Sequence, residues 1–153
     1  MKYIITLFFI SSALLAQNSP VYSKNGLEVD NLNYIDVVVE YLSEDAKKLG
    51  LNREDLDALV RMSLRSNGIK PTNDDSASPY LYININVLKS SVNISIEYFR
   101  LVFYYLGDRT YYKTASTWID GSTGLHGNSG VFITDNLRRL IDKFCIAYYK
   151  ANE

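Results

Sequence analysis

The stretch Tyr80-Leu81-Tyr82-Ile83-Asn84-Ile85-Asn86-Val87 alternates between aliphatic and polar or aromatic side chains at every position. In a β-strand, successive side chains point to opposite faces, so this alternation predicts a half-buried strand. One face carries Leu81, Ile83, Ile85 and Val87, and the other carries Tyr80, Tyr82, Asn84 and Asn86. We expect helices to cover the aliphatic face and to leave the tyrosine-lined face open.

Two further strands follow in the sequence. After a turn at Lys89-Ser90-Ser91, residues 92–106 continue the β pattern. The apolar positions change phase within this segment: Ile94 and Ile96 have even numbers, whereas Leu101 and Phe103 have odd numbers. A strand that keeps one apolar face inward must absorb an extra residue there, so we predict a β-bulge near Glu97 or Tyr98. The turn 107–109 then leads into a fourth strand over 110–119, which is rich in Thr, Tyr and Trp.

The segment before residue 80 predicts a strand and a helix. Residues 34–42 alternate like a half-buried strand, with Asp36 and Glu40 on the polar side. Ser43 caps a brief turn, and Asn52 caps a longer helix that Asn67-Gly68 ends. The polar segment 70–79 contains Asp74-Asp75, but it lacks the ligand spacing of a calcium loop and is expected to be a solvated loop.

The last predicted element is a long helix that starts close to Ser129 or Gly130. Its apolar stripe consists of Ile133, Leu137, Leu140, Ile141, Phe144 and Tyr148. The element order is therefore β-α-β-β-β-α. This order predicts an α+β fold, a two-layer sandwich in which two helices cover one face of a four-stranded mixed sheet. The link from the first to the second strand through a helix allows a right-handed parallel crossover.

The N-terminus has the pattern of an export signal. Lys2 precedes the apolar run 4–10, and a stretch of small residues ends at Ala16. We predict a signal peptide over 1–16 that is cleaved near Ala16, a flexible lead-in over 17–31 and a single α/β domain over 32–153. The run is too short to remain as a membrane anchor, so we expect a secreted or periplasmic protein without a transmembrane segment in the mature chain.

Composition excludes some partners. Loss of residues 1–16 removes one of 16 basic residues and none of the 17 acidic ones, which leaves 15 against 17 and a formal charge of −2. This balance, with scattered basic residues, argues against a nucleic-acid partner. Cys145 is the only cysteine, and its helical spacing beside Ile141 and Tyr148 favours a small core residue over an intermolecular disulfide.

Glycines recur at every third position in 120–130, at Gly121, Gly124, Gly127 and Gly130. A glycine-rich loop at a helix start can bind an anion, but no Lys-Ser or Lys-Thr follows as in a phosphate-binding loop, so a connector is favoured. The weak candidates for a catalytic site are Asp120, Ser122 and His126. They suit a small hydrolase or a metal-dependent enzyme, although Ser122 does not lie in a Gly-x-Ser-x-Gly elbow. We predict no cofactor and no metal site.

The aromatic residues are the stronger functional signal. The chain has 13 tyrosines, more than one core needs. Tyrosine has a large side chain with a polar tip, which suits a recognition surface. The alternative interpretation of the many tyrosines is that they pair across strands and only stabilise an open sheet. The predicted binding residues are Tyr80, Tyr82, Asn84, Asn86 and Trp118.

Three segments carry a resemblance to known proteins: 80–86, 117–124 and 142–152. There the chain resembles small secreted bacterial proteins of unassigned function. The order β-α-β-β-β-α is also similar to that of envelope accessory domains such as the lipopolysaccharide-assembly lipoprotein, which has a lipid-bearing cysteine that this chain lacks. The resemblance implies an accessory fold and carries over no catalytic residue.

These observations favour a non-catalytic binding or accessory module of the envelope or the secreted fraction. Its aromatic sheet face would engage another protein or an envelope component. The alternatives are a small enzyme at the glycine-rich segment, or a soluble carrier of a lipid or glycan. Whether the protein is an enzyme stays open at this level, with a non-enzymatic role favoured.

Overall fold

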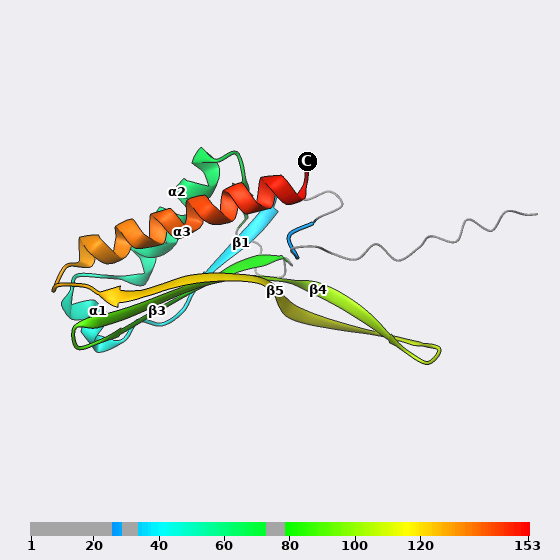
Figure 1. Ribbon diagram of the computed structural model, residues 1–153, viewed down its shortest axis with the longest axis horizontal. Helices are drawn as coiled ribbons and strands as arrows, with labels where there is room; N and C mark the ends of the chain where they lie inside the picture. The colour runs from blue at the N-terminus through cyan, green and yellow to red at the C-terminus, as the bar shows by residue number, and fades with distance from the viewer. Residues whose placement is uncertain (1–25, 29–33, 73–78) are drawn as a thin grey trace, which may run out of the picture.

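The computed structural model describes residues 26–28, 34–72 and 79–153 (Figure 1). The predicted signal peptide, the lead-in apart from residues 26–28, and positions 73–78 of the polar segment lie outside the described residues. Within the described part of the chain, no helix is long and apolar enough to cross a bilayer.

Five strands and three helices make up the described structure. In chain order they are β1 (Tyr34–Val39), α1 (Glu44–Lys48), α2 (Arg53–Ser66), β2 (Lys70–Pro71), β3 (Tyr80–Leu88), β4 (Ser91–Leu106), β5 (Arg109–Leu125) and α3 (Gly130–Ala151). The predicted caps at Ser43 and Asn52 are present, because both side chains accept hydrogen bonds from the backbone at the starts of α1 and α2. Ser129 caps the start of α3 in the same way.

The strands form one mixed sheet in the order β2-β1-β3-β4-β5. β1 is parallel to both β2 and β3, whereas β3, β4 and β5 form an antiparallel meander. The α+β class is therefore confirmed. The predicted count of four strands and two helices is wrong, because the turn after Ser43 closes into the five-residue α1 and because Lys70-Pro71 pairs with β1 at the sheet edge. An edge position tolerates proline, which cannot donate to the ladder.

The helical layer covers one face of the sheet. In Figure 1, α2 and α3 lie on the same side of it, and the apolar stripes of both helices are buried. The aliphatic residues of β3 are buried in the core, as the alternation predicts, together with residues of β1 and β4. Cys145 is buried in this core, where loss of solvation raises the pKa of its thiol to about 12 and keeps it uncharged.

The predicted bulge lies at the expected level but on the other strand. The β3–β4 register is continuous through Tyr98 and Phe99, so β4 contains no extra residue. In the β4–β5 register, Tyr98 pairs with Trp118 and Phe99 pairs with Ser116, which leaves Thr117 as the extra residue in β5. The phase change in β4 has a different cause: its buried face ends at Tyr98, and the later apolar residues occupy the opposite face.

The glycine-rich segment is not a loop over most of its length. β5 continues to Leu125 and pairs with β4 throughout, so the predicted end of this strand at residue 119 is wrong. Gly121 allows this pairing, since a Cβ at that position would lie 2.7 Å from the carbonyl oxygen of Ile94. The glycines thus permit close strand packing, and the connector itself is confined to 126–129.

The core extends to the part of the lead-in that the structure describes. Leu27 is fully buried against the domain. The Thr117 hydroxyl donates to the Gly26 carbonyl oxygen at 2.7 Å, and the Asn152 side-chain amide donates to the Leu27 carbonyl oxygen at 3.0 Å. Residues 26–28 therefore link the bulge in β5 to the C-terminal end of α3. They precede residue 32, where the domain was expected to begin, so the packed structure includes part of the predicted lead-in.

Candidate functional site

Four of the five predicted binding residues lie together on the sheet face opposite the helices. Tyr80, Tyr82, Asn84 and Asn86 alternate with the buried residues of β3, and no described helix covers them (Figure 1). We call this surface the Tyr80 face. The ring of Tyr80 stacks on that of Phe99 with centroids 4.9 Å apart, and the ring of Tyr82 meets the same phenylalanine edge-on at 6.1 Å. The three rings hold one another in fixed positions.

The other end of the Tyr80 face is polar. The Asn84 side-chain amide donates to the Glu40 carboxylate, and the Asn86 amide donates to the Asn84 oxygen at 2.7 Å. A hydrogen bond to Glu40 is the main cause that raises the pKa of the Tyr82 hydroxyl, with desolvation as the second. This phenol therefore stays protonated at neutral pH, and its hydroxyl is directed to the Glu40 carboxylate.

Trp118 does not belong to this surface. It pairs with the buried Tyr98 across the β4–β5 ladder and faces α3, where its ring meets Phe144 edge-on at 5.3 Å. The tryptophan is thus packed against the core on the helix side of the sheet. Sequence reasoning grouped it with the tyrosines because both residue types are enriched in strands, a preference that carries no information about the face.

The three weak catalytic candidates do not converge. Asp120 and Ser122 follow each other on the helix side of β5, whereas His126 lies beyond the end of that strand. The five strand steps from residue 120 to residue 125 span about 16 Å, so the carboxylate and the imidazole cannot act on one atom. Asp120 Oδ1 accepts from the Gly121 backbone at 2.7 Å, and Oδ2 lies 3.7 Å from Lys143 Nζ.

His126 has a structural role in the turn before α3. Its side chain is buried, with Nε2 2.6 Å from the carbonyl oxygen of Lys89 and Nδ1 accepting from the Asn128 backbone at 3.1 Å. Both ring nitrogens are therefore engaged by backbone groups, and the arrangement requires the neutral tautomer with its proton on Nε2. Such a ring cannot serve as a general base without breaking the turn.

The acidic residues of the first strand are also committed to structure. Asp36 is buried and pairs with Arg61 of α2, while Glu40 accepts from Asn84. No group of three or more His, Cys, Asp or Glu side chains that could hold a metal occurs among the described residues.

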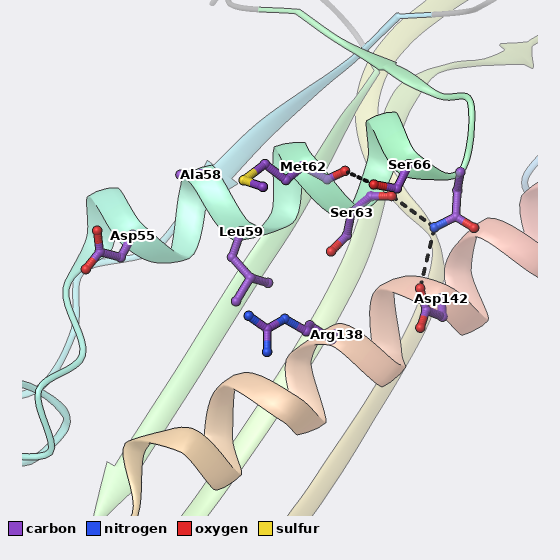
Figure 2. Close-up of a pocket in the computed structure, with 9 residues that line it drawn as sticks. Asp55, Ala58, Leu59, Met62, Ser63, Ser66, Arg138 and Asp142 are labelled. Atoms are coloured by element: carbon purple, nitrogen blue, oxygen red, sulfur yellow. Dashed lines mark hydrogen bonds between the residues drawn. The ribbon is translucent and has the colours of Figure 1, made fainter.

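A groove of about 460 Å³ opens between α2 and α3, on the side of the helices away from the sheet (Figure 2). Leu59 of α2 points toward Arg138 of α3 across it, and Met62 and Asp142 also line the groove. At one end, the Asn67 amide donates to Asp142 at 3.5 Å and to the Ser63 carbonyl oxygen at 2.9 Å. Arg138 is held by Asp135 at 3.0 Å, so the charged groups of this groove already have partners within the protein.

The surface that sequence reasoning missed is the outer part of the β4–β5 hairpin. β3 ends its pairing at Phe99, and the hairpin continues beyond it (Figure 1). Several large apolar side chains are exposed there: Leu101, Phe103, Tyr104, Tyr105, Leu106 and Tyr112. The signal was present in the sequence as the phase change at residue 99, which we interpreted as a bulge rather than as a switch of the apolar face.

No protein-family model matches this chain, and no curated protein matches its sequence.

Proposed function

We propose that this protein is a non-catalytic binding module that engages another protein or an envelope component through the Tyr80 face. The observation that carries this proposal is that Tyr80, Tyr82 and Phe99 form a fixed aromatic cluster on the sheet face that no described helix covers. Ordered aromatic side chains lose little conformational entropy on binding, and they contribute large contact areas.

The polar half of the face adds directional contacts. Asn84 and Asn86 are joined to each other and to Glu40, so their amide groups are held in a defined orientation beside the aromatic cluster. An apolar centre with positioned polar groups at its rim is the usual composition of a protein interface. Because an export signal is predicted at the N-terminus, we propose a partner in the envelope or outside the cell.

The test is affinity capture from extracts of the native envelope with the purified chain as bait, followed by mass spectrometry of what is retained. We expect a specific component that the Tyr80→Ala, Tyr82→Ala double variant fails to retain. Met62→Ala is the matched control, because this side chain is exposed on the helix layer, far from the sheet face. Unchanged capture by a double variant with wild-type circular dichroism would contradict the proposal.

An enzymatic role has less support. The buried His126 is held by two backbone groups, and Asp120 lies several strand residues away from it. No observation in the described structure favours hydrolysis over binding, so the binding module is the function that the geometry supports best.

A further inference from the structure

Among the described residues, the outer part of the β4–β5 hairpin is an arm of two paired strands. Residues 100–106 of β4 pair with 109–115 of β5, and β3 provides no neighbour beyond Phe99. Figure 1 shows this arm extending past the ends of the other strands. A two-stranded hairpin is marginally stable in water unless one of its faces is covered. The arm therefore needs a covering surface that the described part of the chain does not supply.

One face of the arm is apolar and uncharged. Leu101, Phe103 and Tyr105 alternate along β4 on the same side as Phe99, and Tyr112 of β5 lies opposite Phe103. The ring of Phe103 contacts those of Tyr105 and Tyr112, with centroids 6.0 and 6.5 Å apart. We call these four residues the arm strip. The cationic Arg109 and Lys113 pair with Leu106 and Val102 and so belong to the reverse face.

We propose that a second copy of this chain covers the arm strip, in a two-fold dimer whose arms pack strip against strip with Phe103 near the axis. The two hairpins run in opposite directions in this arrangement, and Leu101 of each copy faces Tyr105 of the other. The bodies lie at opposite ends of the paired arms, so Asn84 and Asn86 of each Tyr80 face stay uncovered. The dimer is thus additional to the proposed function and does not depend on it.

The exposed area of the arm strip is large enough for an interface with a second copy of the chain. The four side chains of the arm strip are 52–70% exposed. With about 200 Å² for a fully exposed side chain of this size, they present roughly 500 Å² per copy. Two copies bury on the order of 1,000 Å², which is the lower bound for a specific interface. An exposed apolar patch of this extent matches the largest patch of a typical monomer, and such patches often bind a partner.

The chemistry of the strip also favours self-association. In a two-fold interface a patch meets its own copy, so a charged strip would repel itself whereas an uncharged one does not. A lipid surface is a poorer occupant, because the strand edges of the arm carry backbone groups that hydrocarbon cannot satisfy. Packing of two ribbons about 10 Å apart leaves those edges in water.

Sedimentation equilibrium of the purified protein over a concentration series tests the dimer. We expect a monomer–dimer equilibrium whose dissociation constant rises at least tenfold in Phe103→Lys, because two ammonium groups then meet near the axis. Tyr104→Lys is the matched control, since Tyr104 has a similar exposure but lies on the reverse face, and it should leave the equilibrium unchanged. Circular dichroism of each variant verifies that the fold is intact.

A charge-pair rescue tests the predicted register. Leu101→Glu alone should give a monomer, and adding Tyr105→Lys should restore the dimer because opposite charges then face each other across the axis. A wild-type protein that stays monomeric at high concentration, a dimer indifferent to Phe103→Lys, or a folded double variant without rescue would overturn the proposal. Binding of the wild-type monomer to phosphatidylglycerol-containing vesicles, lost in Phe103→Lys, would assign the strip to a lipid surface and equally overturn it.

Discussion

Arg61 Nη2 lies 3.1 Å from Asp36 Oδ1, and both side chains are largely buried between α2 and β1. The guanidinium also contacts Asp57 at 2.8 Å and the Val37 carbonyl oxygen at 3.2 Å. In the sequence, Asp36 occupies the polar side of an alternating strand, which suggests a solvent-exposed residue. The structure instead places it at the centre of a polar network that joins the helical layer to the sheet.

Removal of one partner of this pair should be costly. Arg61→Met leaves the Asp36 carboxylate buried without its counter-charge, so we expect the free energy of unfolding to fall by about 3 kcal/mol. The double variant Asp36→Val, Arg61→Met should regain at least half of that loss, because two apolar side chains then replace the buried charges. Urea denaturation measures both effects. A double variant no more stable than Arg61→Met would contradict this account.

The glycine-rich segment permits a sharp comparison between two glycines of one strand. At Gly121 a Cβ would lie 2.7 Å from a backbone oxygen of β4, whereas at Gly124 the nearest atom is on the Phe132 ring at 3.9 Å. We expect Gly121→Ala to lower the free energy of unfolding by about 2 kcal/mol because the β4–β5 ladder must shift. Gly124→Ala should be nearly neutral. Thermal melts of the two variants test this, and equal losses would show that the close approach does not matter.

His126 should prove structural rather than catalytic. His126→Ala removes the side chain that joins the Lys89 carbonyl oxygen to the Asn128 backbone, and leaves these groups without that partner. We expect a loss of about 2 kcal/mol in the free energy of unfolding and no change in binding through the Tyr80 face. Chemical denaturation and the capture assay measure the two quantities. Loss of capture in a fully folded variant would instead indicate a functional histidine.

Side-chain alternation was enough to predict which face of β3 is buried and which is open. The helix caps at Ser43, Asn52 and Ser129 were also predictable, because each depends on residues within one turn. The bulge lies at the predicted level near Tyr98 but in β5, and the apolar phase that suggested it marks instead the end of the buried face of β4. The placement of the bulge depends on β5, where Thr117 is held by Gly26 from a distant part of the sequence.

The candidate site was predictable to the same limited extent. Local pattern placed Tyr80 and Tyr82 on the open face, since a strand residue and its second neighbour share a side. It could not place Trp118, because its face depends on the register with β4. The arm was also missed. The β3–β4 pairing begins at Tyr80 opposite Phe99, and no local sequence pattern shows that the rest of β4 lies beyond the reach of β3. Contacts between distant segments determine both features.

Tyr98 offers a test of the core itself. Its side chain is fully buried between the sheet and Phe144, and its hydroxyl has no hydrogen-bond partner among the described residues. A buried hydroxyl without a partner costs its solvation, so we expect Tyr98→Phe to raise the free energy of unfolding by about 1 kcal/mol at pH 7. Tyr80→Phe is the matched control, because Tyr80 is half-exposed and its hydroxyl removal should have little effect.

The advantage of Tyr98→Phe should grow at alkaline pH. Burial is the main cause that raises the pKa of Tyr98 above its ordinary value of 10.0. Above pH 10 the unfolded chain therefore releases this proton while the folded protein retains it, so the unfolded state binds fewer protons and stability falls as pH rises. The phenylalanine variant lacks this contribution. Urea titrations at pH 7 and pH 10.5 should show a larger difference at the higher pH, and a constant difference would mean that the Tyr98 hydroxyl reaches water in the folded protein.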